Sequence, residues 1–223
     1  MSKTEPFDAA AYGGPGWSPR VKTTLQEIGT IWSPCGIQSE YAPLKSVLLH
    51  EPGAELTASD DPNKMQMIEM LNVKRAQRQH QAMARAYEQA GVTVHHVKPA
   101  RPATPNQMFC ADLFFMTPEG AILARPASTV RAGEERWIAR RVSDIGVPII
   151  RSIRGGGTFE GADAMWLDSK TVIVGCGFRT NDEGADQLES ILSEMGVELI
   201  RICLLYTSPS PRDATLSRMP SSA

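Results

Sequence analysis

The sequence lacks the features that mark several classes of protein. Its 223 residues contain no run of 18 apolar residues, so no membrane-spanning helix is expected, and the N-terminus has no apolar core of the signal-peptide type. The formal net charge is only −2, without a block of lysine and arginine, so neither nucleic acid nor a membrane is an expected partner. These absences predict a cytoplasmic location.

Cysteine is also scarce. The four cysteines are widely spaced and form no Cys-x-x-Cys pair; they are Cys35, Cys110, Cys176 and Cys203. Structural disulfides and a zinc site are therefore not expected, and buried thiols are the simplest interpretation. We expect neither a metal nor another cofactor.

A phosphate-binding loop is absent as well. Residues 155–163 read GGGTFEGAD, but counting a G-x-G-x-x-G pattern from Gly155 puts Glu160 at the third glycine position, and the next register fails too. Glu160 and Asp163 would also repel a phosphate, so a Rossmann-type nucleotide binder is disfavoured. A plain turn is one alternative. Carboxylates beside a glycine-rich bend also suit a planar guanidinium with its five N–H donors.

What the sequence does contain is a pattern that occurs three times. Each copy has a short apolar strand, a turn, an amphipathic helix and a strand that begins with Gly-Val. The glycines that follow the helices, Gly91, Gly146 and Gly196, are 55 and 50 residues apart and are expected to cap them. This order predicts an α/β repeat architecture, although a Rossmann sheet would alternate strands and helices too. The expected strand, helix and strand of each copy span 44–53, 63–90 and 91–97; 120–126, 133–145 and 146–153; and 170–180, 182–195 and 196–202.

The two ends depart from this pattern. Residues 1–38 are predicted to be an N-terminal arm and lead-in, and residues 39–203 carry the repeats. Residues 204–223 are rich in serine and proline and interrupt the order of the elements. We expect a disordered, non-native tail there, with a genuine disordered tail as the alternative.

A set of short blocks resembles the guanidine-modifying enzymes, the superfamily of arginine deiminases, dimethylarginine hydrolases and amidinotransferases. The resemblance covers about residues 39–202, and order and spacing both agree. It implies the pentein fold, a five-bladed α/β propeller of which about three blades are present. The matching blocks are Asn106, Phe109 to Asp112, Arg125-Pro126, Arg131 with Gly133-Glu134, Glu160 to Asp163, and Gly175 to Asn181.

The resemblance also implies a reaction. A cysteine near the C-terminus of these enzymes attacks the guanidinium carbon to form a covalent thiouronium, and a histidine acts as general acid. The expected activity is hydrolysis of the guanidino group of arginine or a derivative, of the deiminase or dimethylaminohydrolase type. Amidino transfer and a non-catalytic guanidine-binding protein are the alternatives. A small guanidino compound is the expected partner, and a homo-oligomer is left open.

The reacting residues themselves are expected beyond the repeats. The family's histidine follows the Arg-Thr-Asn block, whereas every histidine here precedes Asp112, and no cysteine stands in the nucleophile's context. The chain alone is therefore expected to be inactive. Cys110 is expected to be a neighbour of the active site, and His80 to face solvent. The histidines are His50, His80, His95 and His96.

The binding residues follow from the resemblance block by block. Asp112 and Glu160 are expected to bind the guanidinium, and Arg131 and Arg179 to position the substrate through its α-carboxylate. Asp163 either accepts backbone N–H groups and so holds its loop, or contacts the substrate.

Two further positions qualify this assignment. Asn181 is expected to cap the helix that follows it rather than to touch substrate. Ala111 stands where the family often has arginine or glutamate, so the residues favour neither the deiminase nor the dimethylarginine hydrolase branch.

Overall fold

The structure is a computed structural model that describes residues 16–100 and 102–203. The first 15 residues of the predicted arm and the predicted tail at 204–223 lie outside the described residues. Within the described part, no helix is both long and apolar enough to cross a membrane. The α-helices are α1 (Thr24–Glu27), α2 (Val73–Gln89), α3 (Glu135–Asp144) and α4 (Asp182–Glu194). The strands are β1 (Ser46–Leu49), β2 (Thr93–His96), β3 (Phe114–Thr117), β4 (Gly120–Leu123), β5 (Ile149–Ser152), β6 (Ala164–Asp168), β7 (Thr171–Cys176) and β8 (Glu198–Cys203).

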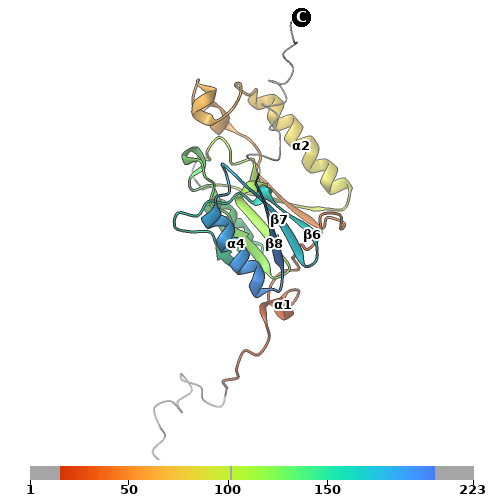
Figure 1. The fold of residues 1–223 in the computed structure, drawn as a ribbon. Coiled ribbons are helices and arrows are strands. Elements are labelled where there is room, and N and C mark those ends of the chain that lie inside the picture. The colour runs from red at the N-terminus through yellow and green to blue at the C-terminus, as the bar shows by residue number, and fades with distance from the viewer. Residues whose placement is uncertain (1–15, 101, 204–223) are drawn as a thin grey trace, which may run out of the picture.

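The strands form three small sheets, and the second and third have the same topology (Figure 1). In each, an antiparallel hairpin (β3–β4 or β6–β7) is followed by a helix and a parallel strand (β5 or β8). The first sheet pairs β1 with β2 in parallel around α2. The predicted α/β repeat is thus confirmed, and no sheet of the described residues closes into a barrel. The hairpin strands β3 and β6 were not predicted.

Glycines end the three long helices as expected. Gly91, Gly146 and Gly196 have φ values of +78°, +79° and +69°, a left-handed conformation that glycine adopts without steric cost. The valine after each glycine is buried, which turns the chain back toward the sheet. Local sequence was sufficient to locate these three turns.

Two elements differ from the sequence-based prediction. The helix expected over 63–90 begins only at Val73, because Asn72 accepts a hydrogen bond from the backbone N–H of Arg75 and caps it there. The residues before it form a short 3-10 helix, η4 (Pro62–Met65), which ends at Gln66 in a left-handed conformation. Regular structure also begins earlier than expected, with the single turn α1 inside the predicted arm.

The hydrophobic core joins the second and third sheets. Figure 1 shows α4 lying against the sheet of β6, β7 and β8, where it buries Leu188 and Leu192. The indole of Trp166 on β6 stacks on Phe115 of β3 at 5.8 Å between ring centroids, and its Nε1 donates to the carbonyl of Met116 at 3.0 Å. Each such buried side chain contributes about 1.5–3 kcal/mol. This packing holds the two sheets in one fixed relation.

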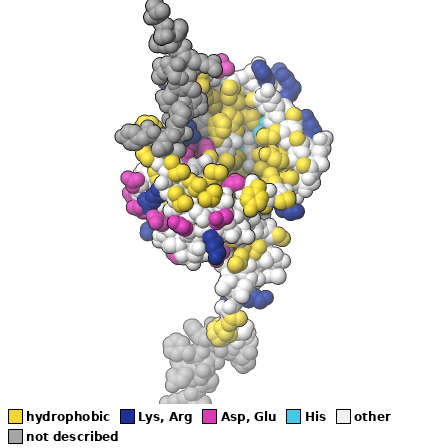
Figure 2. Space-filling model, turned by 45° about the vertical axis from the view of Figure 1, so that its right-hand side comes forward, with side chains coloured by type: hydrophobic (Ala, Val, Ile, Leu, Met, Phe, Trp, Pro, Cys, Tyr) yellow, Lys and Arg dark blue, Asp and Glu magenta, His cyan; other side chains and the backbone are white. Residues whose placement is uncertain are grey.

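One face of the third sheet carries apolar side chains that are exposed or only half-buried. Met165, Ile173 and Ile200 lie side by side across its three strands, and Met165 is 50% exposed. Figure 2 shows hydrophobic side chains gathered on one face of the molecule around a hollow, with acidic side chains at its edge.

Candidate functional site

The loops that precede β3 and β6 meet at the boundary between the second and third sheets. Each contains a short 3-10 helix, η5 (Cys110–Leu113) and η7 (Gly161–Asp163), and the two are in contact. Gly161 makes this approach possible, since a Cβ there would lie 2.1 Å from the carbonyl oxygen of Phe114. The contact brings the sequence blocks of Asp112 and Glu160 together.

The glycine-rich stretch is held as a turn and also presents a carboxylate. Gly155 has φ +65°, and Phe159 pairs with Arg125 through two backbone hydrogen bonds of 3.0 Å. The Arg125 guanidinium donates to the carbonyl of Gly157 at 3.1 Å. Glu160 follows directly and is buried. The turn and carboxylate interpretations of this stretch therefore both apply.

Arg131 lies at the centre of the candidate site with all three guanidinium nitrogens engaged. Its Nε donates to Glu134 at 2.8 Å, its Nη1 to Asp112 at 2.5 Å, and its Nη2 to the carbonyl of Phe109 at 3.2 Å. Nη1 is also 3.6 Å from Oε2 of Glu160. The side chain is only 7% exposed. Asp112 and Glu160 thus both contact one guanidinium, which is the arrangement expected of a pair that binds such a group. In this structure, that guanidinium belongs to Arg131 of the same chain.

This arrangement bears on the role expected for Arg131. Binding of a substrate carboxylate by Arg131 stays a prediction. All three guanidinium nitrogens already donate to protein groups, so a substrate would have to share those donors. Sequence reasoning did not assign Glu134, although it belongs to the Gly133-Glu134 block. The signal for it was its position three residues after Arg131, a spacing that lets the two side chains meet on a helical turn.

Thr180 joins two of the predicted site residues. Its hydroxyl donates to Asp163 Oδ2 at 2.6 Å and accepts from the backbone N–H of Glu160 at 3.3 Å. Asp163 was predicted either to accept backbone N–H groups or to contact substrate, and among the described residues its hydrogen bond comes from this hydroxyl instead. It does hold two loops together, those around Glu160 and around Thr180.

Asn181 caps α4, which confirms the prediction. Its Oδ1 accepts from the backbone N–H of Gly184 at 2.8 Å and from that of Thr158 at 2.9 Å. Its Nδ2 donates to the carbonyl of Gly156 at 2.9 Å. One side chain therefore ends the glycine-rich turn and begins the helix.

Arg179 lies at the solvent edge of the site. Its side chain is 66% exposed, and its Nη1 is 3.4 Å from Oε2 of Glu160. Unlike Arg131, this guanidinium has donors that face solvent and can bind a further anionic group.

The electrostatics of the site are dominated by burial. Burial raises the pKa of Glu160 and Asp163, although Arg131 opposes the effect at Glu160 and the Thr180 hydroxyl opposes it at Asp163. Burial alone would lower the pKa of Arg131, but attraction to Glu134 and hydrogen bonding with Asp112 outweigh it and raise that pKa.

Carboxylates outnumber guanidinium groups in this cluster, so it carries net negative charge when its carboxylates are ionised. Two arginines, Arg131 and Arg179, face four acids. Such a cluster favours a cationic ligand over an anionic one. The acids are Asp112, Glu134, Glu160 and Asp163.

The thiol and imidazole groups near the site have other surroundings. Burial raises the pKa of Cys110 to about 12, so its thiol stays protonated at neutral pH, in keeping with a neighbour rather than a nucleophile. His80, predicted to face solvent, is only partly exposed and lies beside His96, with ring centroids 6.4 Å apart. Among the described residues, no three potential ligands group in a way that could hold a metal ion.

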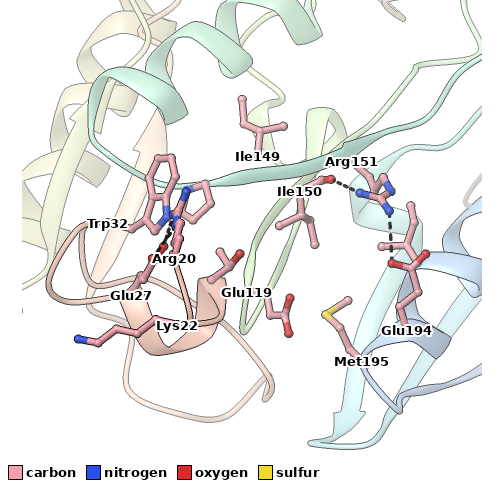
Figure 3. Close-up of a pocket in the computed structure, with 13 residues that line it drawn as sticks. Arg20, Lys22, Glu27, Trp32, Glu119, Ile149, Ile150, Arg151, Glu194 and Met195 are labelled. Carbon is pink, nitrogen blue, oxygen red and sulfur yellow. Dashed lines mark hydrogen bonds and ion pairs between the residues drawn. The ribbon is translucent and has the colours of Figure 1, made fainter. Parts of the chain in front are cut away.

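A cavity of about 460 Å³ lies apart from this cluster, between the N-terminal segment, β5 and the end of α4 (Figure 3). Its charged side chains largely pair with one another: Arg20 with Glu27, and Arg151 with Glu194 at 3.3 Å. Ile149, Ile150 and Met195 supply apolar lining. None of the predicted site residues lines it, so the cavity is not part of the carboxylate cluster.

Comparison with known proteins gives a consistent picture. The sequence model of the family described as "N,N dimethylarginine dimethylhydrolase, eukaryotic" matches residues 53–211. The uncharacterized protein YkgA of Bacillus subtilis is 29% identical over 168 residues, which are 74% of this chain and 57% of that protein. N(G),N(G)-dimethylarginine dimethylaminohydrolase of Pseudomonas aeruginosa is 32% identical over 123 residues, 55% of this chain and 48% of that enzyme. The chain thus spans about half the length of these relatives.

Solved structures show the same fold. The Pseudomonas aeruginosa dimethylaminohydrolase, complexed with citrulline, superposes with a TM-score of 0.61 at 26% identity over 71% of this chain and 61% of its own. The N-terminal domain of ArgZ, a cyanobacterial arginine dihydrolase bound to its substrate, gives a TM-score of 0.58 at 22% identity over 70% of this chain and 56% of its own. The α/β sheets described above are therefore arranged as in these enzymes.

Proposed function

This chain belongs to the N,N dimethylarginine dimethylhydrolase family of guanidine-modifying enzymes, and from that premise we propose that the whole protein hydrolyses the guanidino group of arginine or a derivative. In this proposal the three sheets are three of the five blades of a pentein, and residues 39–203 form that partial propeller. The substrate is a small cation, in keeping with the negative charge of the site.

The observation that carries the proposal is the placement of Asp112 and Glu160 on one guanidinium. The two residues lie in the loops that precede different sheets, 48 positions apart, yet Arg131 Nη1 lies 2.5 Å from one carboxylate and 3.6 Å from the other. Carboxylates so placed bind a planar guanidinium through charge-assisted hydrogen bonds and fix its orientation. A substrate guanidinium would use the oxygens of the same pair that Arg131 leaves open.

Arg179 and Asp163 are proposed to contact different parts of the substrate. Arg179, at the solvent edge, binds the α-carboxylate, while Asp163 completes the acidic wall around the guanidinium. During attack on the guanidinium carbon, fixed carboxylates stabilise the positive charge without reorganising. The attacking cysteine and the general-acid histidine are proposed to come from sequence beyond the described residues, so the 223-residue chain binds guanidines without turning them over.

Removal of either carboxylate charge tests the proposal. Asp112→Asn and Glu160→Gln are each expected to weaken binding of L-arginine about tenfold to a hundredfold, because each removes charge-assisted hydrogen bonds. Isothermal titration calorimetry with L-arginine and with neutral L-citrulline measures the effect. Glu198→Gln, which removes an exposed carboxylate on β8, is the matched control. Equal arginine affinity in wild type and both site variants would refute the assignment.

Arginine binding is also expected to depend on pH. Because burial raises the pKa of Glu160 and Asp163, these groups take up protons above the ordinary values of 4.5 and 3.8. Affinity for L-arginine should therefore begin to fall at a higher pH than ordinary carboxylates would give, whereas affinity for L-citrulline should change little.

The same groups affect folding with the opposite sign: folded pKa values above the unfolded ones contribute stability at low pH that is lost as the pH rises through the folded values. Titrations and urea unfolding at pH 8, 6.5, 5 and 4 measure both trends. An arginine affinity that stays flat down to pH 4 would contradict the first.

A further inference from the structure

Glu134 is a buried carboxylate to which the proposed function gives no role. Its side chain is 0% exposed and it stands at the N-terminus of α3. It makes no side-chain capping hydrogen bond to that helix. One oxygen accepts from Arg131 Nε at 2.8 Å, and the other accepts from the hydroxyl of Thr104. One oxygen thus binds Arg131, and the other is fixed by Thr104, which holds the carboxylate in place beside that arginine.

A carboxylate in such a place requires a reason, since removing an ionised group from water is strongly unfavourable. Burial accordingly raises the pKa of Glu134, against hydrogen bonding from Thr104 and attraction to Arg131. An apolar residue of similar volume would fill the space with a smaller desolvation penalty. What Glu134 adds is one negative charge and one fixed hydrogen-bond acceptor at Nε of Arg131.

The charge matters because of what the far end of Arg131 touches. Nη1 contacts Asp112 and Glu160, the two carboxylates that the proposed function assigns to the substrate. Without Glu134, the charge of Arg131 would be balanced by this pair alone, and less of their attraction would remain for another cation. With Glu134 in place, part of the positive charge of Arg131 is neutralised at Nε, on the side away from Asp112 and Glu160.

We propose that Glu134 is a positioning residue for guanidine binding: it anchors Arg131 through Nε and balances its charge, so that Asp112 and Glu160 keep their charge for the substrate's guanidinium. This inference rests on the proposed function, because it concerns the same carboxylate pair. It predicts that Glu134 affects binding of cationic guanidines selectively, without touching them.

The ratio of L-arginine to L-citrulline affinity separates this role from a merely structural one. Glu134→Gln preserves the size of the side chain and an acceptor for Nε but removes the charge. It is expected to weaken L-arginine binding about tenfold in calorimetry and to change L-citrulline binding less than about twofold. A general loss of structure would weaken both ligands alike. Glu198→Gln is again the control, expected to leave both affinities unchanged.

Thr104→Val supplies a second variant in case Glu134→Gln does not fold. It removes the hydroxyl that donates to Glu134 and is expected to weaken L-arginine about threefold with L-citrulline again unchanged. An unaltered affinity ratio in the folded variants would overturn the inference. If Asp112→Asn weakens arginine while Glu134→Gln does not, only the positioning role fails; if wild type binds neither ligand, the proposed function fails and this inference with it.

Discussion

Replacement of Arg131 by methionine is expected to lower the free energy of unfolding by about 3 to 5 kcal/mol. The side chain is 7% exposed and neutralises Asp112 and Glu134 at 2.5 and 2.8 Å, so its loss leaves buried carboxylates without a counter-charge. Methionine fills much of the same volume, which separates the charge effect from a cavity. Urea denaturation followed by circular dichroism at pH 7 measures the change.

The pH dependence of this loss identifies its cause. Uncompensated carboxylates can escape the penalty by taking up protons, so the destabilisation should shrink as the pH is lowered from 7 to 5. Arg179→Met is the matched control, because that side chain is 66% exposed and should change stability by less than about 1 kcal/mol. A loss for Arg131→Met that is equal at both pH values would point to packing rather than to charge.

Substitution of Gly161 by alanine is expected to destabilise the protein by about 3 kcal/mol or more, since rigid overlap exceeds ordinary overpacking. A Cβ at this position would lie 2.1 Å from the carbonyl oxygen of Phe114 and 2.5 Å from that of Ala111. Both contacts are to backbone, so no side chain can turn away to relieve them. The two loops must separate, and with them Asp112 and Glu160, so arginine affinity should fall as well.

A second glycine provides the control for this substitution. Gly196 also has a positive φ, +69°, but a Cβ there would meet no atom within 4 Å. Gly196→Ala should therefore cost about 1 kcal/mol from backbone strain alone and leave arginine binding intact. Similar unfolding free energies for the two variants would show that the loops do not depend on their close contact.

Much of the fold was predictable because its signals are local. Helix periodicity, the glycine after each helix and the Gly-Val strands depend on residues within one or two turns of each other. The prediction was wrong at the start of α2: the helix begins at Val73, ten residues after its expected start, because Asn72 caps it there. The strands β3 and β6 were missed because their alternating pattern is short and each runs on from a 3-10 turn.

The sequence by itself determined the repeat, the family blocks and the chemical character of the site, since these depend on residue type and spacing along the chain. Only the tertiary structure decided that Asp112 and Glu160 share the guanidinium of Arg131, and that Thr180 rather than backbone N–H groups holds Asp163. These contacts join residues on different loops. They form because Gly161, which has no side chain, lets the loops before β3 and β6 touch. Local sequence patterns carry no information on the distance between these two loops.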